Sequence, residues 1–207
     1  MIKKILNSPN FSKNPRNKRD VKLIIIHYTG MQSKIASLKR LTNTKSKVSC
    51  HYLIDRKGII IKLLDDSKIA WHAGKSKWKS INNLNKNSIG IELVNKGHKY
   101  GFQKYTKQQL KALIKLCLFL KKKYSIKKTN ILGHSDIAPL RKQDPGEKFP
   151  WKMLYKKNLS IWYSKPKTSV SNFKKFNRNS FFSNLYKIGY RYFDKTKKSK
   201  YDHLIVQ

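Results

Sequence analysis

The stretch Lys22-Leu23-Ile24-Ile25-Ile26-His27-Tyr28 decides the fold. Its run of aliphatic, mostly β-branched residues is typical of a strand buried inside a sheet. A histidine at the end of such a strand faces the edge of the sheet. Taken alone, His27 is best interpreted as a hydrogen-bonded core residue, because histidine is often half-buried. The rest of the sequence changes that interpretation.

Two further segments bring possible metal ligands to strand ends. The apolar pair Ile131-Leu132 leads into Gly133-His134-Ser135-Asp136, and Asp144-Pro145-Gly146 begins ten residues after His134. Two histidines and one aspartate on loops at strand ends form the three-ligand set of a catalytic zinc, which leaves a fourth position for water. Asp136 is the rival carboxylate, and spacing alone excludes neither aspartate.

The order of the expected elements is β-α-β-β-β-α-β. Asp55-Arg56-Lys57-Gly58 predicts a hairpin loop, because Gly58 supplies a positive φ between two apolar runs. We therefore expect an α/β domain with a central mixed β-sheet of about five to six strands flanked by helices. The expected elements are strands at 21–28, 52–54, 59–63, 89–94 and 131–132, and helices at 33–41 and from Thr106 onward.

The second helix has the clearest signal. Thr106 and Gln109 have the spacing of a capping box, in which each residue bonds the backbone of the other. The apolar residues after them recur at helical spacing. These residues are Leu110, Leu113, Ile114, Cys117 and Leu120.

Three regions are expected along the chain. Residues 1–20 predict a polar lead-in, in which Pro9 and Pro15 oppose helix. Residues 21–163 predict the α/β domain. Residues 164–207 predict a small helical appendage, too short to bury a core by itself, which either packs on the domain or stays partly disordered.

The composition is strongly basic, with 48 Lys and Arg against 10 Asp and Glu and a formal net charge of +38. Such a charge favours polyanions. No zinc-finger spacing, RNP-type motif or phosphate-binding glycine loop accompanies it, so we expect no specific nucleic-acid partner. The two cysteines, Cys50 and Cys117, suggest no disulfide framework.

Neither a signal peptide nor a membrane span is expected. The basic N-terminus lacks an apolar core segment, and no stretch reaches the ~20 apolar residues of a spanning helix. The expectation is a cytoplasmic monomer, with a periplasmic location as the alternative.

Glu92 and Lys142 are candidates for the remaining chemistry of amide hydrolysis. Glu92 lies in an otherwise apolar strand, where a carboxylate must be paired, coordinated or catalytic because burying it bare is costly. Such a base could take a proton from water and deliver it to the leaving amine. Lys142 lies two residues before Asp144. The alternatives are a structural ion pair for Glu92 and an ordinary solvated lysine for Lys142.

Six short blocks then occur in a family-specific order. The chain resembles the zinc-dependent N-acetylmuramoyl-L-alanine amidases (type 2 amidases), which share their fold with peptidoglycan recognition proteins. The resemblance runs from about Ser8 to Tyr163. Its blocks are Ile26-His27-Tyr28-Thr29-Gly30-Met31, Val48-Ser49-Cys50-His51-Tyr52-Leu53-Ile54-Asp55, Ala70-Trp71-His72-Ala73-Gly74, Asn87-Ser88-Ile89-Gly90-Ile91-Glu92, Gly133-His134-Ser135-Asp136-Ile137-Ala138-Pro139 and Arg141-Lys142-Gln143-Asp144-Pro145-Gly146.

The resemblance implies roles for individual residues. It implies one Zn²⁺ per chain, held by His27, His134 and Asp144. It implies an acid/base role for Glu92 and stabilisation of the intermediate by Lys142. The expected reaction is hydrolysis of the amide between N-acetylmuramic acid and L-alanine, with peptidoglycan or a muropeptide as substrate.

Candidate substrate contacts come from the same blocks, and they are Tyr28, His51, Trp71, His72 and Asn87. His51 has a structural or ligand-supporting role as its alternative. Trp71 could equally be a half-buried core aromatic. His98 has no supporting context and is expected on the surface.

Two other functions compete with the amidase. One is a non-catalytic peptidoglycan-binding protein of the same fold, against which the intact ligand set argues. The other is a basic nucleic-acid- or envelope-binding protein, which only the charge favours. The segment Phe181–Tyr190 is similar to the start of a small helical wall-binding module found behind some of these amidases.

Overall fold

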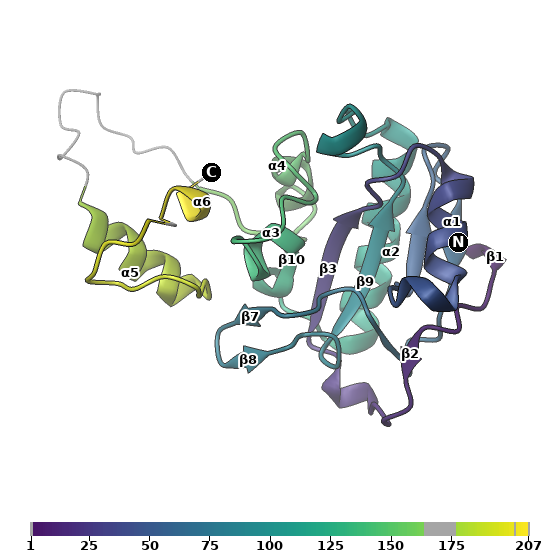
Figure 1. The fold of residues 1–207 in the computed structure, drawn as a ribbon, viewed down its shortest axis with the longest axis horizontal. Coiled ribbons are helices and arrows are strands. Elements are labelled where there is room, and N and C mark those ends of the chain that lie inside the picture. Colours follow the sequence, from purple (N-terminus) through teal and green to yellow (C-terminus); the bar gives the residue numbers. More distant parts are fainter. Residues whose placement is uncertain (1, 164–176, 201, 207) are drawn as a thin grey trace.

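The structure is a computed structural model, and it describes residues 2–163, 177–200 and 202–206. A six-stranded mixed sheet forms its centre, in the order β1-β5-β4-β9-β3-β10 (Figure 1). Among the described strands of this sheet, only β4 and β5 pair antiparallel, as the predicted hairpin requires. The mixed α/β prediction is confirmed. The six strands are β1 (Ile2–Ile5), β3 (Leu23–Tyr28), β4 (Tyr52–Ile54), β5 (Ile60–Lys62), β9 (Ser88–Leu93) and β10 (Ile131–Gly133).

Smaller elements surround this sheet. Two short antiparallel pairs are β2 (Phe11–Ser12) with β6 (Ile69–Ala70), and β7 (Lys77–Trp78) with β8 (Ile81–Asn82). The α-helices are α1 (Lys34–Thr42), α2 (Lys107–Tyr124), α3 (His134–Ile137), α4 (Trp151–Tyr155), α5 (Arg178–Ile188) and α6 (Asp202–Val206). The 3-10 turns are η1 (Lys18–Asp20), η2 (Thr44–Ser46), η3 (His98–Tyr100) and η4 (Lys128–Asn130).

Strand alternation decides which face of the sheet carries the site. Ile24 and Ile26 of β3 belong to the cluster that packs under α2, whereas Leu23 and Ile25 pack with Leu132 on the opposite face. Successive side chains of a strand point to opposite faces. His27 therefore continues the Leu23–Ile25 face, away from α2, at the carboxyl end of the strand.

The long helix begins as predicted, but only half of the capping box forms. Thr106 Oγ1 accepts a hydrogen bond from the Gln109 backbone amide at 3.1 Å. The Gln109 side chain turns instead to the sheet, where it donates to the carbonyls of Ile54 and Val94 at 3.0 and 3.1 Å. These carbonyls lie at the ends of β4 and β9, so the glutamine joins the helix to two strands.

The N-terminal region contributes more than a polar lead-in. Ile2–Ile5 pairs parallel with β5 and forms one edge of the central sheet. The sequence pattern did not predict this strand, because it is short and interrupted by lysines. Charged residues are common on edge strands, where they discourage pairing with other chains.

The C-terminal helices lie beside the β10 edge of the sheet, opposite β1 (Figure 1). Tyr190 packs its ring against Trp78 with centroids 5.0 Å apart, and Lys79 N donates to Gly189 O at 2.8 Å. A Cβ on Gly189 would lie 2.5 Å from the Trp78 ring, so only glycine permits this approach. The sequence left two alternatives for the appendage, and its described residues pack on the domain. Its first part, residues 164–176, lies outside the described residues.

Two further observations bear on the sequence expectations. Cys50 and Cys117 are both buried free thiols. Among the described residues, no helix combines the length and the apolar character that crossing a membrane requires.

Candidate active site

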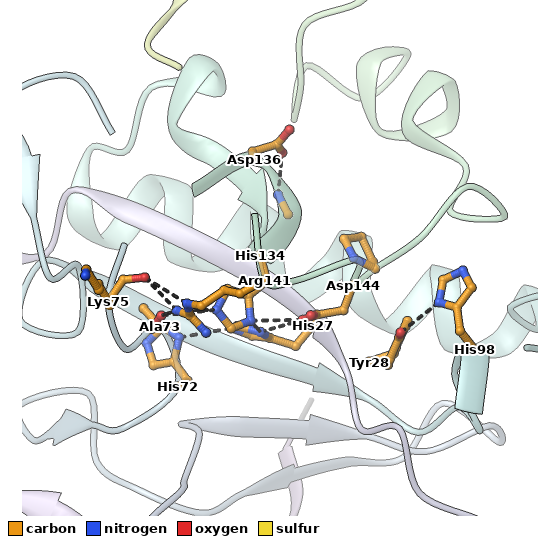
Figure 2. A network of polar contacts seen from close by, with 12 residues as sticks. His27, Tyr28, His72, Ala73, Lys75, His98, His134, Asp136, Arg141 and Asp144 are labelled. Atoms are coloured by element: carbon orange, nitrogen blue, oxygen red, sulfur yellow. Dashed lines mark hydrogen bonds and ion pairs between the residues drawn. The ribbon is translucent and has the colours of Figure 1, made fainter. Parts of the chain in front are cut away.

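Three side chains converge where β3 and β10 end side by side (Figure 2). His27 is the penultimate residue of β3, His134 opens α3 directly after β10, and Asp144 lies in the loop after α3. Asp144 Oδ2 lies 2.9 Å from His27 Nδ1 and 3.2 Å from His134 Nδ1, and the two Nδ1 atoms are 3.0 Å apart. All three residues are buried. Their ligand atoms lie close enough together to hold one metal ion.

The rival carboxylate is engaged elsewhere. Asp136 accepts a hydrogen bond from Gly133 N at 2.7 Å and another from the Tyr190 hydroxyl. It thereby caps α3 and anchors the C-terminal helices. The structure brings Asp144, and not Asp136, to the two histidines.

The hydrogen bond at His134 Nε2 decides which ring nitrogen of His134 carries the proton, and it leaves Nδ1 with a lone pair that points into the cluster. Its Nε2 lies 3.1 Å from the carbonyl oxygen of Ala73, which can only accept, so Nε2 carries the proton. In the neutral ring, Nδ1 is then an acceptor. It faces Asp144 Oδ2, which also accepts. Two acceptors at this distance repel unless a proton or a metal ion lies between them, so the donor set fits a metal ion.

The acid–base character of the cluster matches this requirement. Burial, followed by the charges of His134 and Lys142, lowers the pKa of His27 to about 4. Near neutral pH the cluster thus offers a neutral imidazole at His27.

Glu92 lies next to this cluster on β9. It is the cross-strand neighbour of His27, and its Oε2 is buried with no hydrogen-bond partner among the described residues. Burial, together with the charge of Asp144, raises the pKa of Glu92 to about 8, although Lys142 acts in the opposite direction. A carboxyl group with a pKa near the working pH is suited to accept and return a proton.

A cleft of about 800 Å³ gives solvent access to these groups. His27, Glu92, His134, Lys142 and Asp144 all line it. Lys142 is close enough for its charge to lower the pKa of both His27 and Glu92. The cleft therefore combines a metal-ligand set, a carboxyl group with a raised pKa and a cation.

The predicted substrate contacts divide into two groups. Tyr28, Trp71 and His72 line the cleft. His51 does not: its side chain is fully buried, accepts from Gly90 N at 3.0 Å and lies 3.0 Å from Lys68 O. Asn87 precedes β9 at the end of the strand away from Glu92, and it donates to Asp20 O at 3.1 Å. Neither residue lines the cleft, because buried backbone partners occupy His51 and because Asn87 lies at the opposite end of β9.

Two polar residues near the site were missed in the sequence. His98 lies between Tyr28 and Glu147, at 2.8 Å from the tyrosine hydroxyl and 2.9 Å from Glu147 Oε2. Arg141 donates to the carbonyls of Ala73 and Lys75, and so ties the loop before Asp144 to the segment that orients His134 (Figure 2). Arg141 stands in a quoted sequence block, whereas His98 lies in a polar turn with no pattern.

Fold and site together define an α/β protein with three convergent side chains of metal-ligating type at the carboxyl edge of its sheet. Residues 17–147 match the family model of N-acetylmuramoyl-L-alanine amidase, Amidase_2. The chain belongs to this family.

Two curated relatives illustrate the match. The chain is 39% identical over 157 residues to N-acetylmuramoyl-L-alanine amidase AmiD of Escherichia coli (strain K12), covering 69% of this chain and 55% of AmiD. It is 33% identical over 169 residues to 1,6-anhydro-N-acetylmuramyl-L-alanine amidase AmpD of Haemophilus influenzae, covering 70% of this chain and 86% of AmpD. The chain thus spans little more than half the length of AmiD.

Solved structures agree in fold. Escherichia coli AmiD in complex with the substrate anhydro-N-acetylmuramic acid-L-Ala-D-gamma-Glu-L-Lys matches with a TM-score of 0.74 and 33% identity, over 91% of this chain and 77% of AmiD. AMPDH3 from Pseudomonas aeruginosa in complex with anhydromuramic pentapeptide matches with a TM-score of 0.80 and 29% identity, over 95% of this chain and 84% of AMPDH3.

Proposed function

We propose that this protein hydrolyses the amide bond between the lactyl group of N-acetylmuramic acid and the L-alanine of a stem peptide. The observation that carries the proposal is the convergence of His27, His134 and Asp144 next to Glu92, whose Oε2 has no hydrogen-bond partner among the described residues. Family membership and the two relatives with anhydromuropeptides support the substrate class.

The donor set favours Zn²⁺. Two imidazole nitrogens and one carboxylate oxygen are typical ligands of a catalytic zinc. When bound, zinc would polarise the carbonyl and lower the pKa of water to about 7. His27, His134 and Asp144 would hold it, and their burial limits competition from solvent.

Glu92 and Lys142 would carry out the proton transfer and charge stabilisation. Glu92 takes a proton from the attacking water as the water oxygen bonds to the carbonyl carbon. As the carbon–nitrogen bond breaks, Glu92 returns that proton to the leaving α-amine of L-alanine. The Lys142 ammonium group faces the cleft and stabilises the negative charge on the carbonyl oxygen of the tetrahedral intermediate.

Digestion of anhydromuropeptide by wild type and Glu92→Gln, followed by mass spectrometry, tests this function. The amide keeps the shape of the side chain but cannot accept the proton, so we expect a rate loss of about 10²–10⁴ with the zinc content unchanged. Asp65→Asn is the matched control, because Asp65 is an exposed carboxylate paired with Lys62. Full activity of Glu92→Gln would contradict the role of Glu92.

The same digestion separates the amidase from a non-catalytic peptidoglycan-binding protein. The amidase releases a free L-alanine amine and a muramic acid carboxylate. A wild-type protein that binds the muropeptide but releases neither product would support the binding protein instead.

A further inference from the structure

The loop after β6 contacts both histidines of the proposed metal site. His72 Nδ1 lies 3.0 Å from His27 Nε2, and the next carbonyl, that of Ala73, lies 3.1 Å from His134 Nε2. The loop is itself held by one side chain, because Asn85 Oδ1 accepts from the backbone amides of His72 and Ala73 at 3.1 and 2.7 Å. Each histidine of the site thus has its second ring nitrogen bound by the same dipeptide.

The proton positions along this chain of contacts follow from its far end. Ser88 Oγ lies 2.7 Å from the carbonyl oxygen of Leu84. A carbonyl only accepts, and two oxygens at this distance repel unless a hydrogen lies between them. The single hydroxyl hydrogen of Ser88 therefore points at Leu84.

Ser88 Oγ then has only lone pairs left for His72. Its contact with His72 Nε2, at 3.2 Å, requires that Nε2 carry a proton. In the neutral His72 ring, Nδ1 is consequently an acceptor and receives Nε2–H of His27. His27 Nδ1 is left as a lone pair directed at Asp144 and His134.

We infer that His72 is a positioning residue, which with Ser88 holds His27 in the tautomer that presents Nδ1 to the metal. The inference rests on the proposed metal site. Metal-bound histidines usually donate their second N–H to a carboxylate, carbonyl or water, and such partners strengthen binding. Here a second imidazole takes that place, and a serine fixes its tautomer.

Gly90 independently supports a dedicated position for this ring. A Cβ on Gly90 would lie 2.5 Å from Cγ and 2.7 Å from Nδ1 of His72. Only a residue without a side chain at this point of β9 lets the imidazole lie against the strand next to His27. This steric requirement is separate from the hydrogen bonds.

Zinc affinity in four variants, measured by competition with a chelator, tests the inference. We expect His72→Leu to bind zinc about 10- to 100-fold more weakly, because His27 loses its acceptor. His72→Asn places a carboxamide oxygen near the position of Nδ1 and should stay within about threefold of wild type. Ser88→Ala should lose about three- to tenfold, the range of one net hydrogen bond. Ser160→Ala, a buried serine that donates to the Trp151 carbonyl, should have wild-type affinity.

A second measurement needs no metal and no variant. Long-range ¹H–¹⁵N spectra of the metal-free wild type distinguish protonated from unprotonated ring nitrogens, and we expect His72 and His27 both protonated at Nε2. His72 protonated at Nδ1, or equal zinc affinities for His72→Leu and wild type, would overturn the inference. A wild type that binds no zinc would instead overturn the proposed function.

Discussion

Two buried polar clusters lie side by side in this protein. In one of them the protein itself supplies hydrogen-bond donors to the buried carboxylate, and in the other the carboxylate faces acceptors. Arg16 joins His51 to the first cluster, which surrounds Asp66, because its guanidinium contacts both His51 Nε2 and the Asp66 carbonyl. The His51 ring and the His72 ring of the second cluster have centroids 5.8 Å apart. In the first cluster Asp66 meets donors only: the hydroxyls of Tyr52 and Tyr124 at 2.6 and 2.7 Å, and Lys123 Nζ at 2.8 Å. In the second, Asp144 faces the Nδ1 lone pairs of His27 and His134.

The difference separates a structural network from a ligand site. Burial of a carboxylate is tolerated when hydrogen bonds and an opposite charge surround it, as they surround Asp66. The carboxylate of Asp144 has acceptors as neighbours, and a bound cation makes them compatible. A buried carboxylate therefore belongs to a structural network where its neighbours donate protons to it, and to a ligand site where its neighbours present lone pairs.

The largest expected effect comes from removing each carboxylate in turn. Asp144→Asn should lower zinc affinity by at least about 100-fold, while the metal-free protein unfolds at no lower denaturant concentration, because acceptor repulsion is relieved. Asp66→Ala should keep zinc affinity and lose about 3 kcal/mol of unfolding free energy, because three donors lose their partner. Urea unfolding and zinc competition measure both. Similar losses of stability in the two variants would contradict the comparison.

Replacing Glu92 should raise the unfolding free energy, in contrast to the loss expected for Asp66→Ala, and by a smaller amount. Because its pKa in the folded protein is about 8, the carboxyl group stays protonated between pH 4.5 and 8 while the unfolded chain ionises there. The folded state thus loses stability as pH rises through that window. In metal-free protein at pH 8, Glu92→Gln should raise the unfolding free energy by about 1–3 kcal/mol. An unchanged or lower value would argue against a buried, unpaired carboxyl group.

His51, next to the first cluster, should make the unfolding free energy fall as the pH is lowered. Burial, and then the charge of Arg16, lower the pKa of His51 to about 3 in the folded protein. Below pH 6.5 the unfolded chain therefore binds a proton that the folded chain does not. The unfolding free energy should fall by about 1.4 kcal/mol per pH unit for this residue between pH 6.5 and 3, and buried His27 adds to the fall down to pH 4. Chemical unfolding of metal-free protein across this range, with no loss of stability, would contradict this assignment.

The smallest expected effect concerns the contact between domain and appendage. Tyr190→Phe removes the hydroxyl bound to Asp136 but leaves the Gly133 amide on that carboxylate. We expect the free energy of local opening of α5 to fall by about 1 kcal/mol, with no change elsewhere, since the ring still packs on Trp78. Hydrogen exchange of α5 amides reports this directly. Equal acceleration of exchange in β3 would show that the contact stabilises the whole domain.

Local patterns predicted most of the fold. The apolar run of β3, the hairpin around Gly58 and the periodic face of α2 each carry their own signal. Ile2–Ile5 does not, because its place at the sheet edge depends on pairing with β5 and not on its own pattern. The Gln109 side chain likewise does not complete the capping box, because it donates to strand carbonyls that only the folded chain brings near.

The candidate site was predictable for the residues at strand ends and less so around them. His27, Glu92, His134, Lys142 and Asp144 meet in one cleft. The choice of Asp144 over Asp136 came from the family resemblance, and the structure supplies the physical reason, which is the Tyr190 bond to Asp136. The contact of His72 with His27 depends on the path of the loop after β6. No periodicity or spacing records that path.

Anomalous diffraction at the zinc edge, from crystals of zinc-loaded protein, tests the central claim most directly. We predict one peak per chain, about 2.0–2.2 Å from His27 Nδ1, His134 Nδ1 and Asp144 Oδ2, and none at the Asp66 cluster. A chain without a peak at these three atoms, or with zinc bound through Nε2 of either histidine, would contradict the account.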